Sequence, residues 1–200
     1  MIEGIRGEVI SILQFSWPTV VMGVIIAVLL RVTYLITNKR KLVIHEELFS
    51  LCFVIYILCL FYVVTFQDVS WSSHNYIPFK EILRYDFGSM LFYKNIFGNM
   101  LLFLPFGVFI KKYVKTDSIF IVLLLGFITS LSVEVIQFLI GRVFDVDDII
   151  LNVIGCGLGF IIYTLFQNFS DKLPKFFHKD IFWDIISILI LGGFIWFLIP

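Results

Sequence analysis

The stretch SIFIVLLLGFITSLSVEVIQFLIGRVFDVDDIILNVIGCGLGFIIYTLF, residues 118–166, decides the fold class of this chain. It contains two apolar runs, 118–140 and 149–166, each close to the roughly 20 residues that an α-helix needs to cross a bilayer. A short polar segment separates the runs, and Glu134 lies inside the first one. Ionisable groups at membrane depth are costly and usually serve a functional site. The stretch therefore predicts two membrane-spanning helices joined by a polar segment with a function.

The composition of the whole chain agrees with this fold class. Of its 200 residues, 60% are hydrophobic and 15% are charged, whereas soluble domains are about half apolar and a quarter charged. We expect an all-α protein, a polytopic helical bundle in the membrane, with residues 1–200 forming a single domain. Because the formal net charge is zero, nothing favours a nucleic-acid partner, and the lipid bilayer is the expected partner.

About six transmembrane helices are predicted from the apolar runs. The third run is short, and Pro105 inside it should kink the helix. Apolar residues at helical spacing in residues 1–15 predict an N-terminal interfacial amphipathic helix before the first span. The predicted spans are residues 17–36, 48–66, 96–110, 118–140, 149–166 and 181–199.

Basic residues predict the orientation in the membrane. They concentrate in three alternate segments, 39–41, 111–115 and 172–179, which the positive-inside rule places on the cytoplasmic side. We expect Arg31, near the end of the first span, to extend toward the first of these segments. The Asn75–Phe79 and Arg142–Asp148 loops are then extracytoplasmic.

Under this topology, polar residues from three helices lie within about 9 Å of the same interface. Glu134 and Gln137 are three residues apart and share a helix face. If a helix begins near Asp145, then Asp148 and Asn152 fall on one stripe with it, while Asp147 points off the stripe and should be solvated. The candidate ligand-binding or structural cluster consists of Asn95, Asn99, Glu134, Gln137, Arg142, Asp145, Asp148 and Asn152.

A structural interpretation of the same residues is also open. Asn99, Gln137 and Asn152 would serve as interhelical hydrogen-bonding groups, and Glu134 would form an ion pair with Arg142. The spacing Gly155-x-x-x-Gly159 allows another helix to approach closely. We assign four residues to helix packing: Pro105, Gly107, Gly155 and Gly159.

Catalytic and metal-binding patterns are weak. The acidic side chains offer hard oxygen ligands, but their spacing matches no calcium loop, and Arg142 opposes a bound cation. We therefore predict no metal and no cofactor. The three histidines lie in scattered loops and form no Ser-His-Asp pattern. If the protein is an enzyme, Glu134 and Asp148 are the candidates for a catalytic base.

Four sequence elements resemble the VanZ family. They are Asn75 with Ile77-Pro-Phe79, the segment Lys94–Gly107, the pair Glu134 and Gln137, and the series Arg142, Asp145, Asp148, Asn152 and Gly155. The resemblance covers about residues 50–166, so the helices at about 17–36 and 181–199 lie outside it. It implies a multi-pass protein of the bacterial plasma membrane and cell envelope. The founding member of the family is associated with resistance to teicoplanin, a glycopeptide antibiotic.

Two functional hypotheses follow. We favour a non-enzymatic polar site in the outer leaflet that binds a lipid-linked envelope precursor or a lipophilic glycopeptide and so contributes to resistance. Arg142 would bind a phosphate or carboxylate through its planar guanidinium. The alternative is an intramembrane enzyme that acts on a lipid-linked cell-wall precursor, with Glu134 or Asp148 as the base.

Overall fold

The computed structural model describes residues 2–66, 74–86, 88–170, 172, 174 and 179–198. Helices dominate these residues, and none of them belongs to a β-strand. The chain divides into two compact units: Met1–Val63 with Ser170–Pro200, and Val64–Phe169. We call these the outer-segment unit and the central unit, after their places in the sequence.

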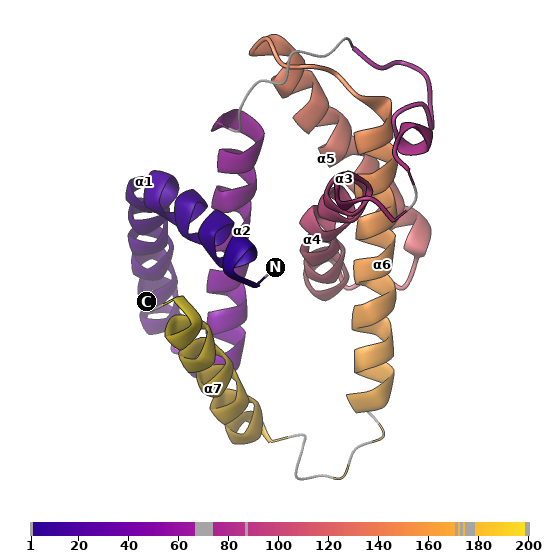
Figure 1. Cartoon of the computed structure of the whole chain (residues 1–200). Helices are drawn as coiled ribbons and strands as arrows, with labels where there is room; N and C mark the ends of the chain where they lie inside the picture. The colour runs from indigo at the N-terminus through magenta and orange to yellow at the C-terminus, as the bar shows by residue number, and fades with distance from the viewer. Residues whose placement is uncertain are drawn as a thin grey trace. The chain divides into compact units, whose positions relative to one another are not determined.

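The outer-segment unit is built from α1 (Ile2–Thr37), α2 (Ile44–Phe66) and α7 (Asp180–Leu198) (Figure 1). The predicted N-terminal segment is helical, and it continues without a break into the first predicted span. Pro18 lies inside α1, where a proline removes one backbone hydrogen bond. The first predicted span therefore forms the second part of a longer helix.

Polar contacts hold the ends of these helices. The Nε and Nη2 groups of Arg31 in α1 donate to the two carboxylate oxygens of Glu47 in α2, at 2.7 and 2.9 Å. Arg31 lies beside the 39–41 segment, as expected, and its ion-pair partner is an acid on the neighbouring helix. At the start of α2, the backbone N–H of His45 donates to Asp184 of α7 at 2.7 Å, and the His45 ring lies 2.8 Å from the same oxygen.

The central unit contains the two helices of the deciding stretch, α5 (Ile119–Leu139) and α6 (Val146–Ser170). Before them come a short 3-10 turn, η1 (Ile82–Arg84), and a continuous helical run. This run consists of α3 (Met90–Phe92), the π-helical turn η2 (Tyr93–Phe97) and α4 (Gly98–Val114).

The third predicted span was too short. The helical run covers Met90–Val114, which is 25 residues, and it is long and apolar enough to cross a membrane. It begins earlier because the Ser89 side chain caps it by accepting from the Phe92 N–H at 3.1 Å. The π-helical turn η2 contains polar residues and connects α3 to α4. Pro105 lies within α4.

Five helical stretches among the described residues have the length and composition of membrane spans: Trp17–Thr37, Ile44–Val63, Met90–Val114, Ile119–Leu139 and Val146–Ser170. The sixth predicted span coincides with α7, whose 19 residues are not among these five. The protein is thus a helical, multi-pass membrane protein.

Glycines bring α4 and α6 into direct backbone contact. A Cβ atom at Gly155 would lie 2.1 Å from the carbonyl oxygen of Met100, and one at Gly159 would lie 2.0 Å from that of Leu104. On the other helix, a Cβ at Gly107 would lie 1.9 Å from the carbonyl oxygen of Cys156. Only glycine fits at this spacing, so these residues set the depth at which the polar side chains of α4 and α6 meet.

Candidate functional site

Asn75 joins the loop before η1 to the loop between α5 and α6. Its N–H donates to the Phe144 carbonyl at 2.9 Å, and its own carbonyl accepts from the Val146 N–H at 3.1 Å. Its side-chain amide donates to Asp145 at 2.8 Å and accepts from the Ile77 N–H at 3.1 Å. Asn75 is only 2% exposed. These four bonds fix both loops on the same side of the central unit.

Asp145 caps the N-terminus of α6. Its Oδ1 atom accepts from the Asp147 N–H at 2.8 Å, which is the usual geometry of an N-cap side chain. Its own N–H donates to Oε2 of Glu134 at 2.9 Å. Burial raises the pKa of the Asp145 carboxyl, while the hydrogen bonds from Asn75 and from the Asp147 N–H act in the opposite direction. Asp145 therefore fixes the start of α6.

The prediction that Asp147 is solvated was wrong. Asp147 is only 1% exposed. Its carboxylate accepts from the backbone N–H groups of Phe79, Glu81 and Ile82. Phe79 has a φ of +67°, in the left-handed region, so the chain turns at this residue. Pro78 and Phe79 form the turn that collects these donors. The sequence marked the Asn75 to Phe79 element as one of the four family-like elements, but only the fold shows that this element binds Asp147.

Gln137 links Glu134 to Arg142. With the amide oriented so that both of its ends are satisfied, its nitrogen donates to Oε1 of Glu134 at 3.0 Å and its oxygen accepts from Nη1 of Arg142 at 2.9 Å. Gln137 and Arg142 are also joined through the backbone, since the Arg142 N–H donates to the Gln137 carbonyl at 2.9 Å. Glu134 is 2% exposed, so the chain of contacts runs from a buried acid to the half-buried guanidinium.

Two further hydrogen-bonded pairs connect α6 to α4 and to α5. The side-chain amide of Asn99 donates to Oδ1 of Asp148. One turn deeper in α6, the side-chain amide of Asn152 donates to the Ser130 hydroxyl at 2.9 Å. The Asn152 Oδ1 atom is buried and has no hydrogen-bond partner among the residues that the structure describes. Sequence reasoning missed Ser130, although its position four residues before Glu134 places the two on one helix face.

Asn95 takes part in none of the hydrogen bonds described above. It is half-buried in the π-helical turn η2, and no described side-chain hydrogen bond connects it to the acidic residues. Within the part of the chain that the structure describes, no group of three or more His, Cys, Asp or Glu side chains has the arrangement of a metal site. The described contacts thus join six of the eight candidate residues to one another in pairs and chains, and Asn152 pairs with Ser130.

An apolar pocket lies beside this network. It has a volume of about 200 Å³ and is lined by Tyr76, Val135, Phe138 and Phe144. Tyr76 and Phe144 stack with ring centroids 5.6 Å apart. Arg142 lies in the short segment between two of the lining residues, Phe138 and Phe144. The loop between α5 and α6 therefore carries Arg142 and one of the four lining residues, Phe144, while the others come from α5 and from the loop before η1.

The comparison with protein families identifies the chain. The model of the VanZ/LLP1 family matches residues 53–167, which is more than half of the sequence. The chain belongs to the VanZ/LLP1 family. The VanZ/LLP1 match includes α4, α5, most of α6 and both loops that Asn75 joins, and it confirms the resemblance inferred from the four sequence elements. No curated protein and no solved structure matched the chain.

Proposed function

We propose that this VanZ/LLP1 protein binds an amphiphilic component at the outer leaflet of the bacterial plasma membrane without transforming it. The ligand would be a lipid-linked cell-wall precursor or a lipophilic glycopeptide of the teicoplanin type, and binding would contribute to resistance. The observation that carries the proposal is the restrained guanidinium of Arg142, in a loop that also contributes Phe144 to the aromatic pocket. An amphiphile with an anionic group and an apolar chain matches this pair.

The contacts of Arg142 support a recognition role. Gln137 accepts from Nη1 and is itself held by Glu134, so the orientation of the guanidinium is restricted before any ligand arrives. A planar guanidinium binds a phosphate or carboxylate through two parallel hydrogen bonds. Restricting such a group in advance lowers the entropy cost of binding. The arrangement favours an anion that approaches from the loop side.

The acidic residues of the loops serve a supporting role in this proposal. Asp147 accepts from three backbone N–H groups, and Asn75 uses both its backbone and its side chain to hold the loop between α5 and α6. Binding sites need such a second layer to keep their contact groups in place. We therefore assign ligand contact to Arg142 and the pocket, and support to Asp145, Asp147 and Asn75.

Catalysis by Glu134 fits the contacts less well. One carboxylate oxygen accepts from the Asp145 N–H and the other from the Gln137 amide, and the residue is 2% exposed. A general base must come within hydrogen-bonding distance of the proton that it removes. Both oxygens of Glu134 are instead engaged in holding the loop and the arginine.

The decisive experiment exchanges Arg142 for lysine. Arg142→Lys keeps the charge and loses the planar fork, so we expect a clear loss of protection when the variant complements a deletion in a susceptible bacterium. Resistance would be measured against lipidated and non-lipidated glycopeptides, with a selective loss for the lipidated drugs. Arg84→Lys is the matched control, because Arg84 is an exposed arginine paired with Glu81. Wild-type protection by Arg142→Lys would contradict the proposal.

A further inference from the structure

A polar hollow lies in the outer-segment unit, lined by residues that precede the VanZ/LLP1 match at 53–167. It has a volume of about 510 Å³ and lies where α1 ends and α2 begins. Four basic and two acidic side chains line it, together with Tyr34 and Leu35, so the hollow has two excess positive charges. The charged lining residues are Arg31, Lys39, Arg40, Lys41, Glu46 and Glu47.

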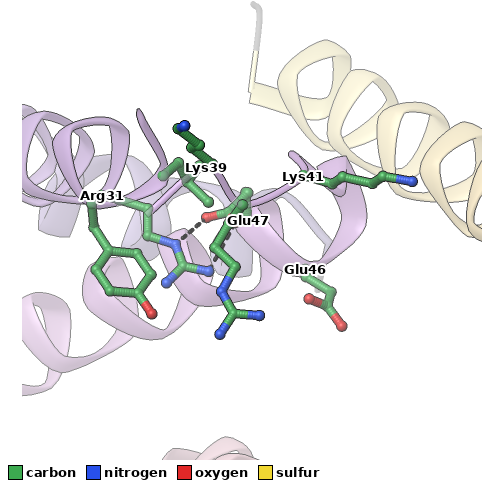
Figure 2. Close-up of a pocket in the computed structure, with 8 residues that line it drawn as sticks. Arg31, Lys39, Lys41, Glu46 and Glu47 are labelled. Atoms are coloured by element: carbon green, nitrogen blue, oxygen red, sulfur yellow. Dashed lines mark hydrogen bonds and ion pairs between the residues drawn. The ribbon is translucent and has the colours of Figure 1, made fainter. Parts of the chain in front are cut away.

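One acid of the hollow is already neutralised. Glu47 accepts from both Nε and Nη2 of Arg31, and Figure 2 marks these contacts between the two side chains with dashed lines. The ion pair fixes Arg31 against α2 and reduces the negative charge that a bound anion would meet. Lys39 and Lys41 extend from the connecting segment in different directions (Figure 2). Their long stems allow the ammonium groups to turn toward a ligand.

The backbone at Lys39 is unusual for a lysine. The N–H of Lys39 donates to the Ile36 carbonyl at 3.3 Å, and the N–H of Arg40 donates to the Leu35 carbonyl at 3.0 Å. These two bonds form a Schellman motif, whose left-handed position normally holds glycine. Lys39 occupies it with a φ of +50°. A lysine in this conformation strains the backbone, and such strain is often retained where the side chain has a functional role.

The hollow lies beside apolar helix surfaces that match lipid chains. Ile36 and Leu42, on either side of the basic segment, are 73% and 62% exposed, and Leu30 is 68% exposed. The helices leading to the hollow, Trp17–Thr37 and Ile44–Val63, have the composition of membrane spans. The basic groups therefore stand at the end of apolar helices, at the depth where phospholipid headgroups lie.

We propose that this hollow binds the phosphate of an anionic phospholipid headgroup in the leaflet at the loop between α1 and α2. The positive-inside rule accounts for basic residues in this loop, but it requires neither a hollow nor a left-handed lysine. The site is independent of the proposed ligand site in the central unit, and the predicted topology places it on the cytoplasmic side.

The test measures how strongly the purified protein retains phosphatidylglycerol over phosphatidylcholine in detergent, by native mass spectrometry. Since a basic residue near an anionic surface contributes about 1 kcal/mol, we expect Arg40→Gln with Lys41→Gln to weaken selective retention by roughly 25-fold. The matched control is Lys172→Gln with Lys179→Gln. It removes the same charge from two exposed lysines on the same predicted side, and it should change retention by less than about two-fold.

Two outcomes would overturn the proposal. Equal losses in both double variants would show general attraction to the surface, and unchanged retention in the first would exclude the hollow. Lys39→Gly separates binding from folding, because glycine relieves the left-handed strain while removing the charge. We expect unchanged or higher thermal stability with roughly five-fold weaker retention. Titration with inorganic phosphate distinguishes the source of the phosphate, and binding as tight as that of the lipid would refute the headgroup assignment.

Discussion

The two units of the protein use different interactions to hold their helices. In the central unit, α4 and α6 touch through glycines, and buried side chains bond across three helices and two loops. In the apolar 18-residue stretch of α6 that could cross the membrane, 44% of the residues are buried. In the corresponding stretches of α1 and α2, only 6% are buried. In the outer-segment unit, the contacts of Arg31 with Glu47 and of His45 with Asp184 lie near helix ends. Substitutions should therefore lower the free energy of unfolding more in the central unit than in the outer-segment unit.

The largest effect is expected for Asp147→Ala. It leaves the N–H groups of Phe79, Glu81 and Ile82 without their acceptor, and each buried unsatisfied donor costs roughly 1–3 kcal/mol. Because these groups are only partly buried, we expect a loss of about 4 kcal/mol in the free energy of unfolding. The measurement is denaturation in mixed micelles. Asp86→Ala, an exposed carboxylate in the same loop, should lose less than about 0.5 kcal/mol.

A slightly smaller loss is expected for Gly155→Ala. The added methyl would lie 2.1 Å from the Met100 carbonyl oxygen, and two helix backbones must separate to accept it. We expect a loss of about 3 kcal/mol in micelle denaturation. Gly98→Ala in α4 is the control, since nothing lies within 4 Å of its Cβ position. Equal stability of the two variants would show that α4 and α6 do not pack as described.

Glu134→Gln tests the central unit for chemistry as well as stability. The amide keeps one acceptor but places an NH₂ group against donors, so we expect a loss of about 1–2 kcal/mol in stability. Protection against glycopeptides should fall less than about three-fold, because Arg142 remains near its position. A general base would lose about 10²-fold or more. A loss of that size in a folded variant would favour the enzyme alternative.

The smallest effect is expected in the outer-segment unit. Arg31 is 46% exposed and its partner Glu47 is 20% exposed, and such ion pairs contribute about 0–1 kcal/mol. Arg31→Gln should therefore lower the free energy of unfolding by at most about 1 kcal/mol, with a smaller difference at high salt. A loss as large as that of Asp147→Ala would abolish the contrast between the two units.

The sequence alone determined the fold class and the helices. Long apolar runs can satisfy their backbone in a bilayer only as helices or closed barrels, and helical length fixed the spans of α2, α5 and α6 closely. It also determined the family, because the four polar elements fall in order along the chain. The start of the third span was missed, since Ser89 caps a helix that runs through polar residues before its apolar part.

Only the tertiary structure decided what each polar residue does. Asp147 was expected in solvent because helical spacing describes one helix and contains no information about a loop 66 residues earlier in the chain. The fold brings the Phe79 turn over that carboxylate and buries it. Likewise, spacing predicted Glu134 and Gln137 on one face, but the chain through Gln137 to Arg142 depends on how the loop returns. Local periodicity sets which side chains share a face, and long-range packing sets which partners they meet.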